Sequence, residues 1–366
     1  MLSIFLNPYF INITLILFLF IFLKYLKVDN KLINRIIIIV SAINWIFLSG
    51  FRALNVGADT INYKNMFERT SFTSWNEIFG FFLKMFSSRA QGRDPGYELI
   101  VKTIQLISLD YQVFLFIIAI ITIVPLSIWI HKNSKEPLTS FMVFNVLFFS
   151  FFAITGIRQT LAMVLIVFIG YRFVLKRKLI PFLIISFIAF TIHKSAIVFV
   201  PFYFLSNVKS QRWHLYMALL MFGFLMIFRN QYFKILAMAG GFDNYDVYAS
   251  GGPKVFTLLL AGIILLIIWK IDFNENNPKT NSYINATILA LLLLPISWVN
   301  PSAMRVVMYF SVFLMVLIPL LFERFKHQEK ALVYASFFVL ILINFLTSIP
   351  NYNFFWDYSV IIGIAG

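Results

Sequence analysis

The chain has 366 residues, of which 61% are hydrophobic and 12% are charged, and its mean hydropathy is +0.87. This composition excludes a water-soluble domain, a disordered protein and a secreted disulfide scaffold, because it matches a chain made almost entirely of apolar membrane spans. The net charge of +15 arises from 30 Lys and Arg against 15 Asp and Glu. In a membrane protein such an excess is first explained by basic cytoplasmic loops, so we expect no nucleic-acid partner.

Hydropathy predicts twelve membrane-spanning segments. They cover residues 9–26, 33–50, 111–130, 138–157, 159–175, 179–193, 195–207, 214–228, 255–271, 283–299, 305–322 and 331–348. The sixth and seventh segments are short, and only His193 and Lys194 separate them. We therefore expect an all-α polytopic membrane protein of about 12 transmembrane helices, with residues 1–366 forming a single integral membrane domain.

The basic residues predict the orientation of these spans. With the N-terminus outside, every short cytoplasmic loop carries at least two Lys or Arg residues, as the positive-inside rule requires. The reverse orientation would place the cluster Lys176-Arg177-Lys178 outside. We therefore expect both termini outside, together with two long external segments, residues 51–110 and 229–254.

The external loop 51–110 is too polar to span a membrane, yet it contains two amphipathic patterns. Apolar residues recur at helical spacing over 78–86, and again over 97–107 after Asp94-Pro95, which suits an N-cap followed by the first helical position. Both patterns predict helices that lie in the membrane interface or over the mouth of the bundle. The glycine-rich second loop, 229–254, is expected to form a flexible external flap.

Polar residues at the outer ends of spans are the first functional candidates, because such groups are costly near lipid. Arg52 stands where the second span ends. Asp59 or Thr60 suits the N-cap of a short helix that places Tyr63 and Phe67 on one face. The structural alternative makes Asp59 only a cap and Arg52 only an interfacial anchor.

The run Asp94-Pro95-Gly96-Tyr97-Glu98 is a second candidate. Its structural alternative is a loop turn and a helix start, and Glu98 in a first helical turn is also what the helix dipole favours. We include Tyr97 and Glu98 among the candidate substrate-binding residues.

Arg158 and Gln159 follow Gly156 between two apolar spans without any other polar spacer. This arrangement points a guanidinium into the outer mouth of the bundle, and arginine is suited to bidentate recognition of phosphate. The alternative is an arginine that only anchors the span end in the interface.

Two further positions lie at predicted outer span ends. His193 precedes Lys194, and a histidine in such a place can act as a general base near neutral pH. Arg305 is the only charged residue between Lys279 and Glu323. The alternatives are a structural helix-end histidine and a second interfacial anchor.

Missing motifs narrow the function further. There is no phosphate-binding loop for ATP, no nucleophile elbow and no Asp-x-Asp of a nucleotide-dependent glycosyltransferase. The chain lacks cysteine, and its four histidines are scattered, so we expect no metal site and no cofactor. Ionisable residues are nearly lacking in the middle of the spans, which counts against an ion-driven transporter.

At these residues the chain resembles the EpsG family of polytopic membrane proteins, which is related to Wzy-type O-antigen and exopolysaccharide polymerases. The resemblance runs from about residue 45 to 210, and in the last third it is mainly one of hydropathy. The matching elements are Phe51-Arg52, Val56-Gly57-Ala58-Asp59-Thr60, Tyr63, Phe67, Asp94-Pro95-Gly96-Tyr97-Glu98, Gly156-Ile157-Arg158-Gln159, Ala162 and His193-Lys194-Ser195-Ala196.

The resemblance implies a glycosyltransferase of GT-C-like architecture in the bacterial inner membrane, with its active face outside. It would transfer a growing glycan from undecaprenyl pyrophosphate to a lipid-linked repeat unit, without a nucleotide sugar. Its partners would be these lipid-linked glycans, membrane lipids and a chain-length regulator.

The resemblance also suggests roles for the candidate residues. Arg158 and Arg305, with Arg52 or Lys194, would hold the leaving pyrophosphate. Either His193 or Asp59 would take the hydroxyl proton, and we prefer His193 because histidine titrates near neutral pH. The substrate-binding candidates are completed by Gln159, Tyr63, Tyr97 and Glu98, of which the two tyrosines would stack on sugar rings.

Three other functions share this span count. A lipid-linked oligosaccharide flippase should line a central cavity with charge across the membrane, whereas here the charges cluster at one predicted face. A membrane O-acyltransferase usually needs a histidine deep in the bundle, whereas His193 is predicted outside. A chain-length-regulating partner would not need the arginine, aspartate and histidine set.

Overall fold

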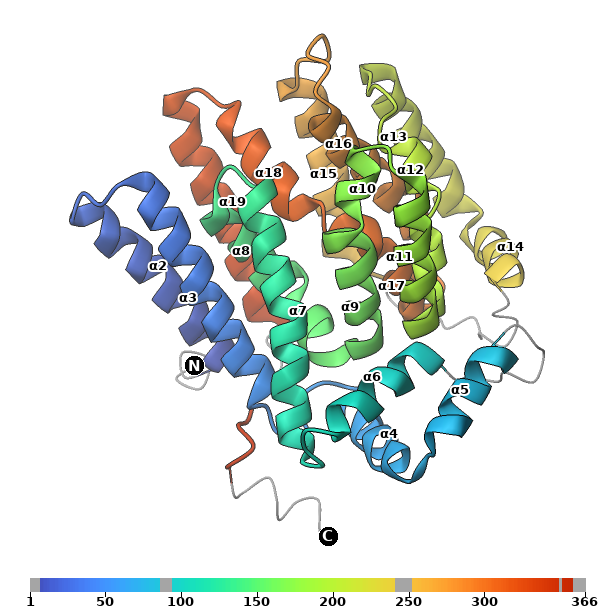
Figure 1. Ribbon diagram of the computed structural model, residues 1–366. Coiled ribbons are helices and arrows are strands. Elements are labelled where there is room, and N and C mark those ends of the chain that lie inside the picture. Colours follow the sequence, from blue (N-terminus) through green and yellow to red (C-terminus); the bar gives the residue numbers. More distant parts are fainter. Residues whose placement is uncertain (1–6, 86–93, 241–251, 349–350, 358–366) are drawn as a thin grey trace. The chain divides into compact units, whose positions relative to one another are not determined.

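The computed structural model describes residues 7–85, 94–240, 252–348 and 351–357 (Figure 1). In these residues the secondary structure is helical, apart from one isolated antiparallel β-bridge between Arg52 and Phe354. The chain divides into two compact units. Unit 1 consists of Met1–Tyr171, Pro181–Ile197 and Phe338–Gly366, and unit 2 consists of Arg172–Ile180 and Val198–Phe337.

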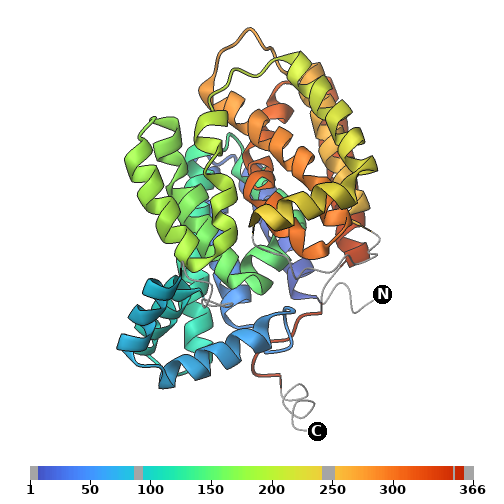
Figure 2. The same ribbon diagram turned by 90° about the vertical axis from the view of Figure 1, so that its right-hand side faces the viewer.

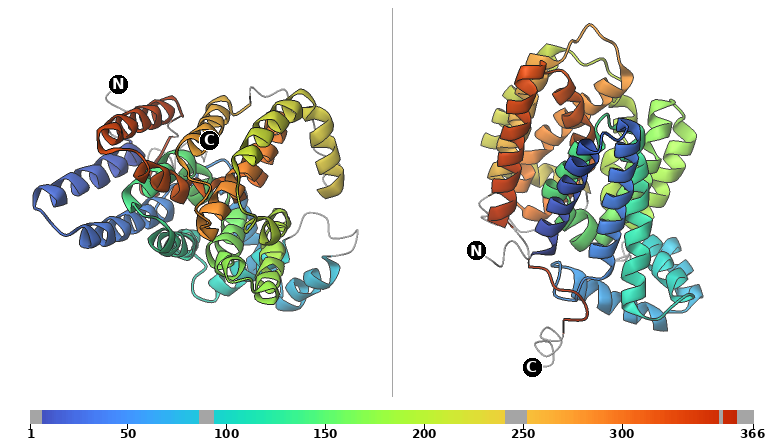
Figure 3. Two further views of the ribbon diagram at one scale, coloured as in Figure 1. Left: turned by 90° about the horizontal axis from the view of Figure 1, so that it is seen from above. Right: turned by 90° about the vertical axis from the view of Figure 1, so that its left-hand side faces the viewer.

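Unit 1 contains the helices of the first half of the chain. In chain order they are α2 (Pro8–Tyr25), α3 (Asn30–Gly50), α4 (Thr60–Phe72), α5 (Trp75–Lys84), α6 (Pro95–Gln105), α7 (Tyr111–Asn133), α8 (Pro137–Leu147), η1 (Ser150–Thr155), α9 (Ile157–Met163), η2 (Val164–Ile169) and most of α11 (Leu179–Ile192). Helices α2 and α3 run side by side (Figure 3). The three short helices α4, α5 and α6 gather at the end of α7 where that helix begins (Figures 1 and 2).

Unit 2 contains most of the second half of the chain. Its helices are α12 (Phe202–Leu205), α13 (Arg212–Ile227), α14 (Arg229–Gly240), α15 (Lys254–Lys270), α16 (Pro278–Leu293), η4 (Leu294–Trp298), η5 (Pro301–Ala303), α17 (Met304–Ser311) and α18 (Leu314–Glu323). The division between the units falls inside α10 (Tyr171–Leu175), α11, η3 (Lys194–Phe199) and α19 (His327–Ser348).

Short polar side chains fix where the long helices of unit 1 begin. The Asp29 carboxylate accepts from the backbone N–H groups of Lys31 and Leu32 at the start of α3. The Asp110 carboxylate accepts from the Gln112 N–H at 2.6 Å at the start of α7. Each carboxylate satisfies donors that a helix leaves unpaired in its first turn.

The twelve predicted apolar segments are largely helical, but several of them are divided between two or more helices. Among the described residues, five are long and apolar enough to cross a membrane, or seven if each of two bent pairs is one span. The bends are 90° between α13 and α14 and 51° between the η5–α17 pair and α18. The π-helical turns η1 and η2 interrupt the fourth and fifth predicted segments. The protein is therefore an all-α, multi-pass membrane protein.

The core of unit 1 is built where α3 packs against α7 and α8. Trp45 on α3 donates its indole N–H to the Asn145 side-chain oxygen of α8 at 2.5 Å. The Trp45 ring also lies 6.0 Å from Tyr9 and 5.4 Å from Phe149. These contacts hold the part of α3 from which the chain continues into the segment before α4.

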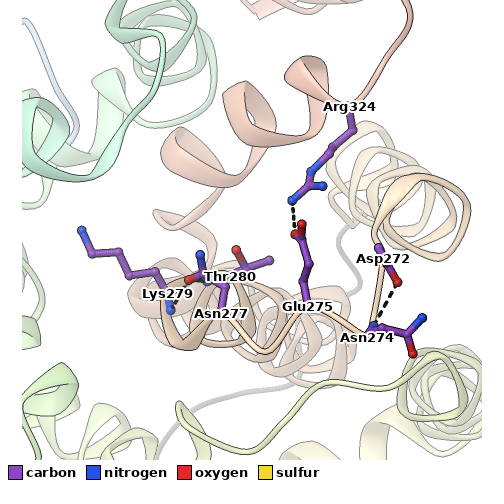
Figure 4. Close-up of polar contacts among 7 residues, drawn as sticks. All are labelled: Asp272, Asn274, Glu275, Asn277, Lys279, Thr280 and Arg324. Carbon is purple, nitrogen blue, oxygen red and sulfur yellow. Dashed lines mark hydrogen bonds and ion pairs between the residues drawn. The ribbon is translucent and has the colours of Figure 1, made fainter.

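In unit 2 the loop between α15 and α16 is held by polar contacts (Figure 4). The Glu275 carboxylate accepts from the Arg324 guanidinium at 2.6 Å, which joins this loop to the end of α18. The Asn277 side chain caps α16 by accepting from the N–H groups of Lys279 and Thr280. These interactions give the loop a structural role.

Candidate functional site

The segment after α3 turns sharply before α4 begins. Gly57 has a φ of +91°, a left-handed conformation that glycine adopts without strain. Asp59 then takes the N-cap position of α4, although its side chain makes no capping hydrogen bond. Tyr63 and Phe67 are both buried on one face of α4, which confirms the predicted helix and its inward face.

Asp94 precedes α6, and Pro95 takes the first turn of that helix, as predicted. The Asp94 carboxylate does not cap α6. Its Oδ2 atom lies 2.8 Å from Nη1 of Arg158 and 3.8 Å from Nδ1 of His193. Asp94 therefore lies near two candidate residues, Arg158 and His193, that are 64 and 99 positions away in the sequence.

Arg158 follows the π-helical turn η1 and lies in the first turn of α9. Its backbone N–H donates to the Tyr63 hydroxyl at 3.4 Å, and its guanidinium lies 5.9 Å from the centre of the Tyr63 ring. The side chain is 26% exposed, and its Nε atom has no hydrogen-bond partner among the described residues. Arg158 is thus held on two sides and keeps a free donor.

His193 lies immediately after the last residue of α11, and Lys194 begins the 3₁₀-helix η3. The end of α11 packs so closely against the start of α6 that a side chain at Gly96 would overlap Thr191. Both His193 and Lys194 are half-buried. The small size of Gly96 is therefore what allows the Asp94 carboxylate to approach His193.

Arg52 has a different environment from Arg158. It is 1% exposed, and its Nη1 atom donates to the Ser49 carbonyl at 2.5 Å. Its Nε and Nη2 atoms have no hydrogen-bond partner among the described residues. Burial lowers the pKa of Arg52, and the surrounding phenols partly oppose this effect. These phenols belong to Tyr9, Tyr63, Tyr111 and Tyr352.

Tyr63 and Tyr97 lie between the two arginines. Their ring centroids are 5.9 Å apart, and both residues are buried. Burial raises the pKa of both phenols, so both are neutral hydrogen-bond donors at physiological pH. Because they pack on each other, neither ring presents an open face to a sugar in this structure.

The other predicted site residues are more dispersed. Gln159 is buried and donates to the Met163 sulfur at 3.7 Å, and Glu98 is buried in the first turn of α6. Asp59 is half-buried at the start of α4 and acts electrostatically on Tyr63. Arg305 lies in α17, which belongs to unit 2.

The structure therefore brings together Arg158, His193, Tyr63 and Tyr97, and it adds Asp94 as the residue that connects them. The sequence marks the run from Asp94 to Glu98 as a candidate, but it predicts site roles only for Tyr97 and Glu98 and a helix cap for Asp94. The contacts of Asp94 with Arg158 and His193 join positions far apart in the sequence, so no local pattern reveals them. The described residues contain no group of three or more His, Asp or Glu side chains able to hold a metal ion.

Comparison with known proteins extends the resemblance beyond these motifs. The chain matches the EpsG family over residues 35–360, which includes the last third of the sequence. No curated protein and no solved structure matches it. The match covers most of the chain and spans all the site residues described above. The chain therefore belongs to the EpsG family, a family of membrane proteins linked to exopolysaccharide synthesis.

Proposed function

We propose that this protein is a polysaccharide polymerase that transfers a growing glycan from undecaprenyl pyrophosphate to a lipid-linked repeat unit. The observation that carries the proposal is the Asp94 carboxylate placed between Arg158 and His193. One site thereby combines a group that binds anions with a group that accepts protons. Glycosyl transfer from a lipid pyrophosphate to a sugar hydroxyl requires both.

Arg158 binds the leaving pyrophosphate in this proposal. Without substrate, its charge is balanced by Asp94 at 2.8 Å. A pyrophosphate carries more negative charge than one carboxylate and offers oxygen pairs that match the guanidinium fork. Stabilisation of developing charge by one preorganised donor is worth about 3–4 kcal/mol. Lys194 and the buried Arg52 add positive potential at the same end of unit 1, and Arg305 stays a candidate on the basis of the sequence alone.

His193 is the proposed general base. Its Nδ1 atom faces Asp94, which leaves Nε2 to accept the proton of the attacking hydroxyl. The hydroxyl oxygen forms a bond to the anomeric carbon of the donor glycan, and the bond from that carbon to the pyrophosphate oxygen breaks. The proton stays on His193, and the electron pair leaves with the pyrophosphate. We call Asp94, Arg158 and His193 the Asp94 cluster. Asp59 is the alternative base, although it lies close to Tyr63 rather than in the Asp94 cluster.

The buried residues around the cluster have supporting roles in this scheme. Tyr63 positions Arg158 by accepting its backbone N–H. Gln159 and Glu98 are buried in the first turns of α9 and α6, near Arg158 and Asp94 in the sequence, and are assigned to the polar surroundings of the pyrophosphate. Tyr97 packs behind Tyr63 as a neutral phenol.

The proposal places this site on the outer face of the bacterial inner membrane, in a GT-C-like bundle of twelve spans. Support comes from the ends of unit 1. Helix α3 runs from the turn around Lys27, which Lys24 and Lys31 flank on α2 and α3, to the end that carries Arg52 and α4. Helix α7 runs from the same end to Lys132. Basic loops thus lie opposite the cluster, as expected if they are cytoplasmic. A chain-length regulator would contact the product at this outer face.

A reconstituted lengthening assay tests the function. The purified protein in nanodiscs is supplied with the lipid-linked repeat unit extracted from the producing cells, and products are sized on a gel. We expect a ladder with wild type and none with Arg158→Ala. Arg69→Ala is the matched control, because Arg69 is an exposed arginine on α4 outside the cluster.

The same preparation distinguishes the polymerase from a flippase. If wild type moves the lipid-linked unit between leaflets but never lengthens it, the proposed function is wrong. A full ladder from Arg158→Ala at normal protein levels would show that the cluster does not have the role assigned to it here.

A further inference from the structure

Unit 1 contains a cleft that the Asp94 cluster does not use. Its volume is about 430 Å³, within the range of roughly 300–1,000 Å³ that small-molecule sites occupy. The residues that matter for its chemistry are Lys64, Glu68, Asp110, Tyr111, Phe355 and Asp357. None of the three residues Asp94, Arg158 and His193 lines it.

One wall of the cleft comes from the segment 351–357, which pairs with the end of α3. The Ala53 N–H donates to the Asn353 carbonyl at 2.9 Å, and the Phe355 N–H donates to the Phe51 carbonyl at 3.0 Å. The Phe355 ring stacks on Phe51 with centroids 5.9 Å apart. Because backbone hydrogen bonds hold this wall, the cleft is formed before any ligand arrives.

The side chains that line the cleft carry a net negative charge. Three carboxylates, those of Glu68, Asp110 and Asp357, line it together with one ammonium group, that of Lys64. Lys64 lies 3.6 Å from Glu68 and already balances that carboxylate. The remaining negative charge would repel a pyrophosphate. The cleft is therefore no extension of the anion-binding site.

The lining suits a saccharide without negative charge. A sugar ring has an apolar C–H face and a rim of hydroxyl donors. Phe355 is 43% exposed and offers an aromatic surface, and ionised carboxylates accept hydroxyl hydrogen bonds strongly. We propose that this cleft binds a neutral or amine-bearing stretch of glycan. The proposal rests on the proposed function, since it assigns the cleft to the sugar part of the same lipid-linked substrates.

Helix α4 contributes residues to both binding regions. Tyr63 contacts Arg158 from one position of the helix, and Phe67, one turn later, lines the cleft. Tyr111 connects the cleft to the start of α4, because its hydroxyl donates to the Thr60 carbonyl at 3.1 Å. A glycan held in the cleft would therefore lie about one turn along α4 from the group that holds the phosphate.

The test measures saccharide binding separately from transfer. Full-length protein in nanodiscs is titrated with phosphate-free oligosaccharides of a few repeat units, released from the cells' own polysaccharide by partial hydrolysis. We expect saturable binding with wild type, and about tenfold weaker binding with Phe355→Ala. Phe72→Ala is the matched control: Phe72 is a 90% exposed aromatic on α4 outside the cleft, and its loss should change nothing.

Phe355→Ala could weaken binding only because it unfolds the segment 351–357, so a second variant changes a cleft residue outside that segment. Asp110→Asn removes a charge from the cleft but keeps the cap of α7, because asparagine caps as well as aspartate. We expect several-fold weaker binding of the neutral oligosaccharide. Inorganic pyrophosphate should not compete with the oligosaccharide for wild type. Competition by pyrophosphate at low concentration would overturn the charge argument.

Failure of this proposal can be told apart from failure of the function. Arg158→Ala should abolish lengthening and leave oligosaccharide binding unchanged. If wild type does not bind the oligosaccharide, or if Phe355→Ala and Asp110→Asn bind it as wild type does, the cleft is not a saccharide site, whatever the lengthening assay shows. A third arm uses the same glycan on its lipid pyrophosphate. If only this form responds to Phe355→Ala, the cleft recognises the lipid rather than the sugar, and the proposal is overturned.

Discussion

Arg158 and Arg52 lie at the same end of unit 1, and both were predicted to hold pyrophosphate, but their surroundings differ. Arg158 is 26% exposed and has a carboxylate partner, Asp94, at 2.8 Å. Arg52 is 1% exposed and is surrounded by neutral phenols, with no ion pair among the described residues. A ligand can take the place of Asp94 beside Arg158, whereas it would have to displace the tyrosine side chains around Arg52 to reach that guanidinium. An arginine is therefore a candidate for binding pyrophosphate when a ligand can reach its guanidinium and can replace its present partner. Positive charge alone is not enough.

The largest expected effect comes from His193, which faces the same Asp94 carboxylate as Arg158 does. His193→Ala should reduce the rate of lengthening about 10²–10⁴-fold, because it removes the proposed base. Single-turnover rates with the lipid-linked repeat unit measure this loss. His214→Ala is the control, since His214 lies at the start of α13 in unit 2. Equal rates for the two variants would leave Asp59 as the candidate base.

Arg158→Lys should reduce lengthening about 10²-fold, since lysine keeps the charge but loses the planar fork. The protein should reach wild-type levels, because the ammonium can still contact Asp94. The quantity to measure is the rate per molecule of inserted protein. Near-complete rescue by lysine would show that point charge suffices, and the argument from bidentate binding would not stand.

Asp94→Asn should have a smaller effect, about tenfold on the rate, which corresponds to about 1.4 kcal/mol. The amide keeps the size of the side chain but no longer stabilises a protonated His193. Because Arg158 also loses its competing carboxylate, we expect tighter binding of inorganic pyrophosphate by the same variant. A change in rate without a change in pyrophosphate binding would limit the role of Asp94 to His193.

Arg52→Met should have the smallest effect, a reduction of lengthening by less than about tenfold. A buried charge without an ion-pair partner carries a large desolvation cost that an apolar side chain of similar size does not, so the thermal unfolding temperature should stay the same or rise. Arg158→Met is the matched variant, and its activity should be lost. If both variants lose activity equally, the contrast between the two arginines is wrong.

Local patterns predicted much of the region around the site. The capping sequence before α6 and the apolar spacing in α4 gave the correct starts and inward faces of both helices. These features depend on neighbours three or four positions apart. The approach of Asp94 to Arg158 and His193 depends on the packing of α6 against the end of α11, for which the sequence offers only Gly96.

The breaks within the predicted spans also could not be predicted from neighbouring residues in the sequence. The segment that contains η1 is uniformly apolar, and nothing in its composition distinguishes a π-helical turn from an α-helical one. The same turn determines where α9 begins and therefore where Arg158 points. Hydropathy located the apolar segments, but it could not show which of them would form one continuous helix.

The pairing of residues 351–357 with the end of α3 also has a consequence for biogenesis. Phe355 is translated some 300 residues after Phe51, yet the backbone of each bonds to the other to complete the cleft wall. This end of unit 1 is therefore completed only after α19 has been synthesised. A protein truncated after Ser348 should still enter the membrane but lack this wall, so bulky tags are better placed at the N-terminus when saccharide binding is to be measured.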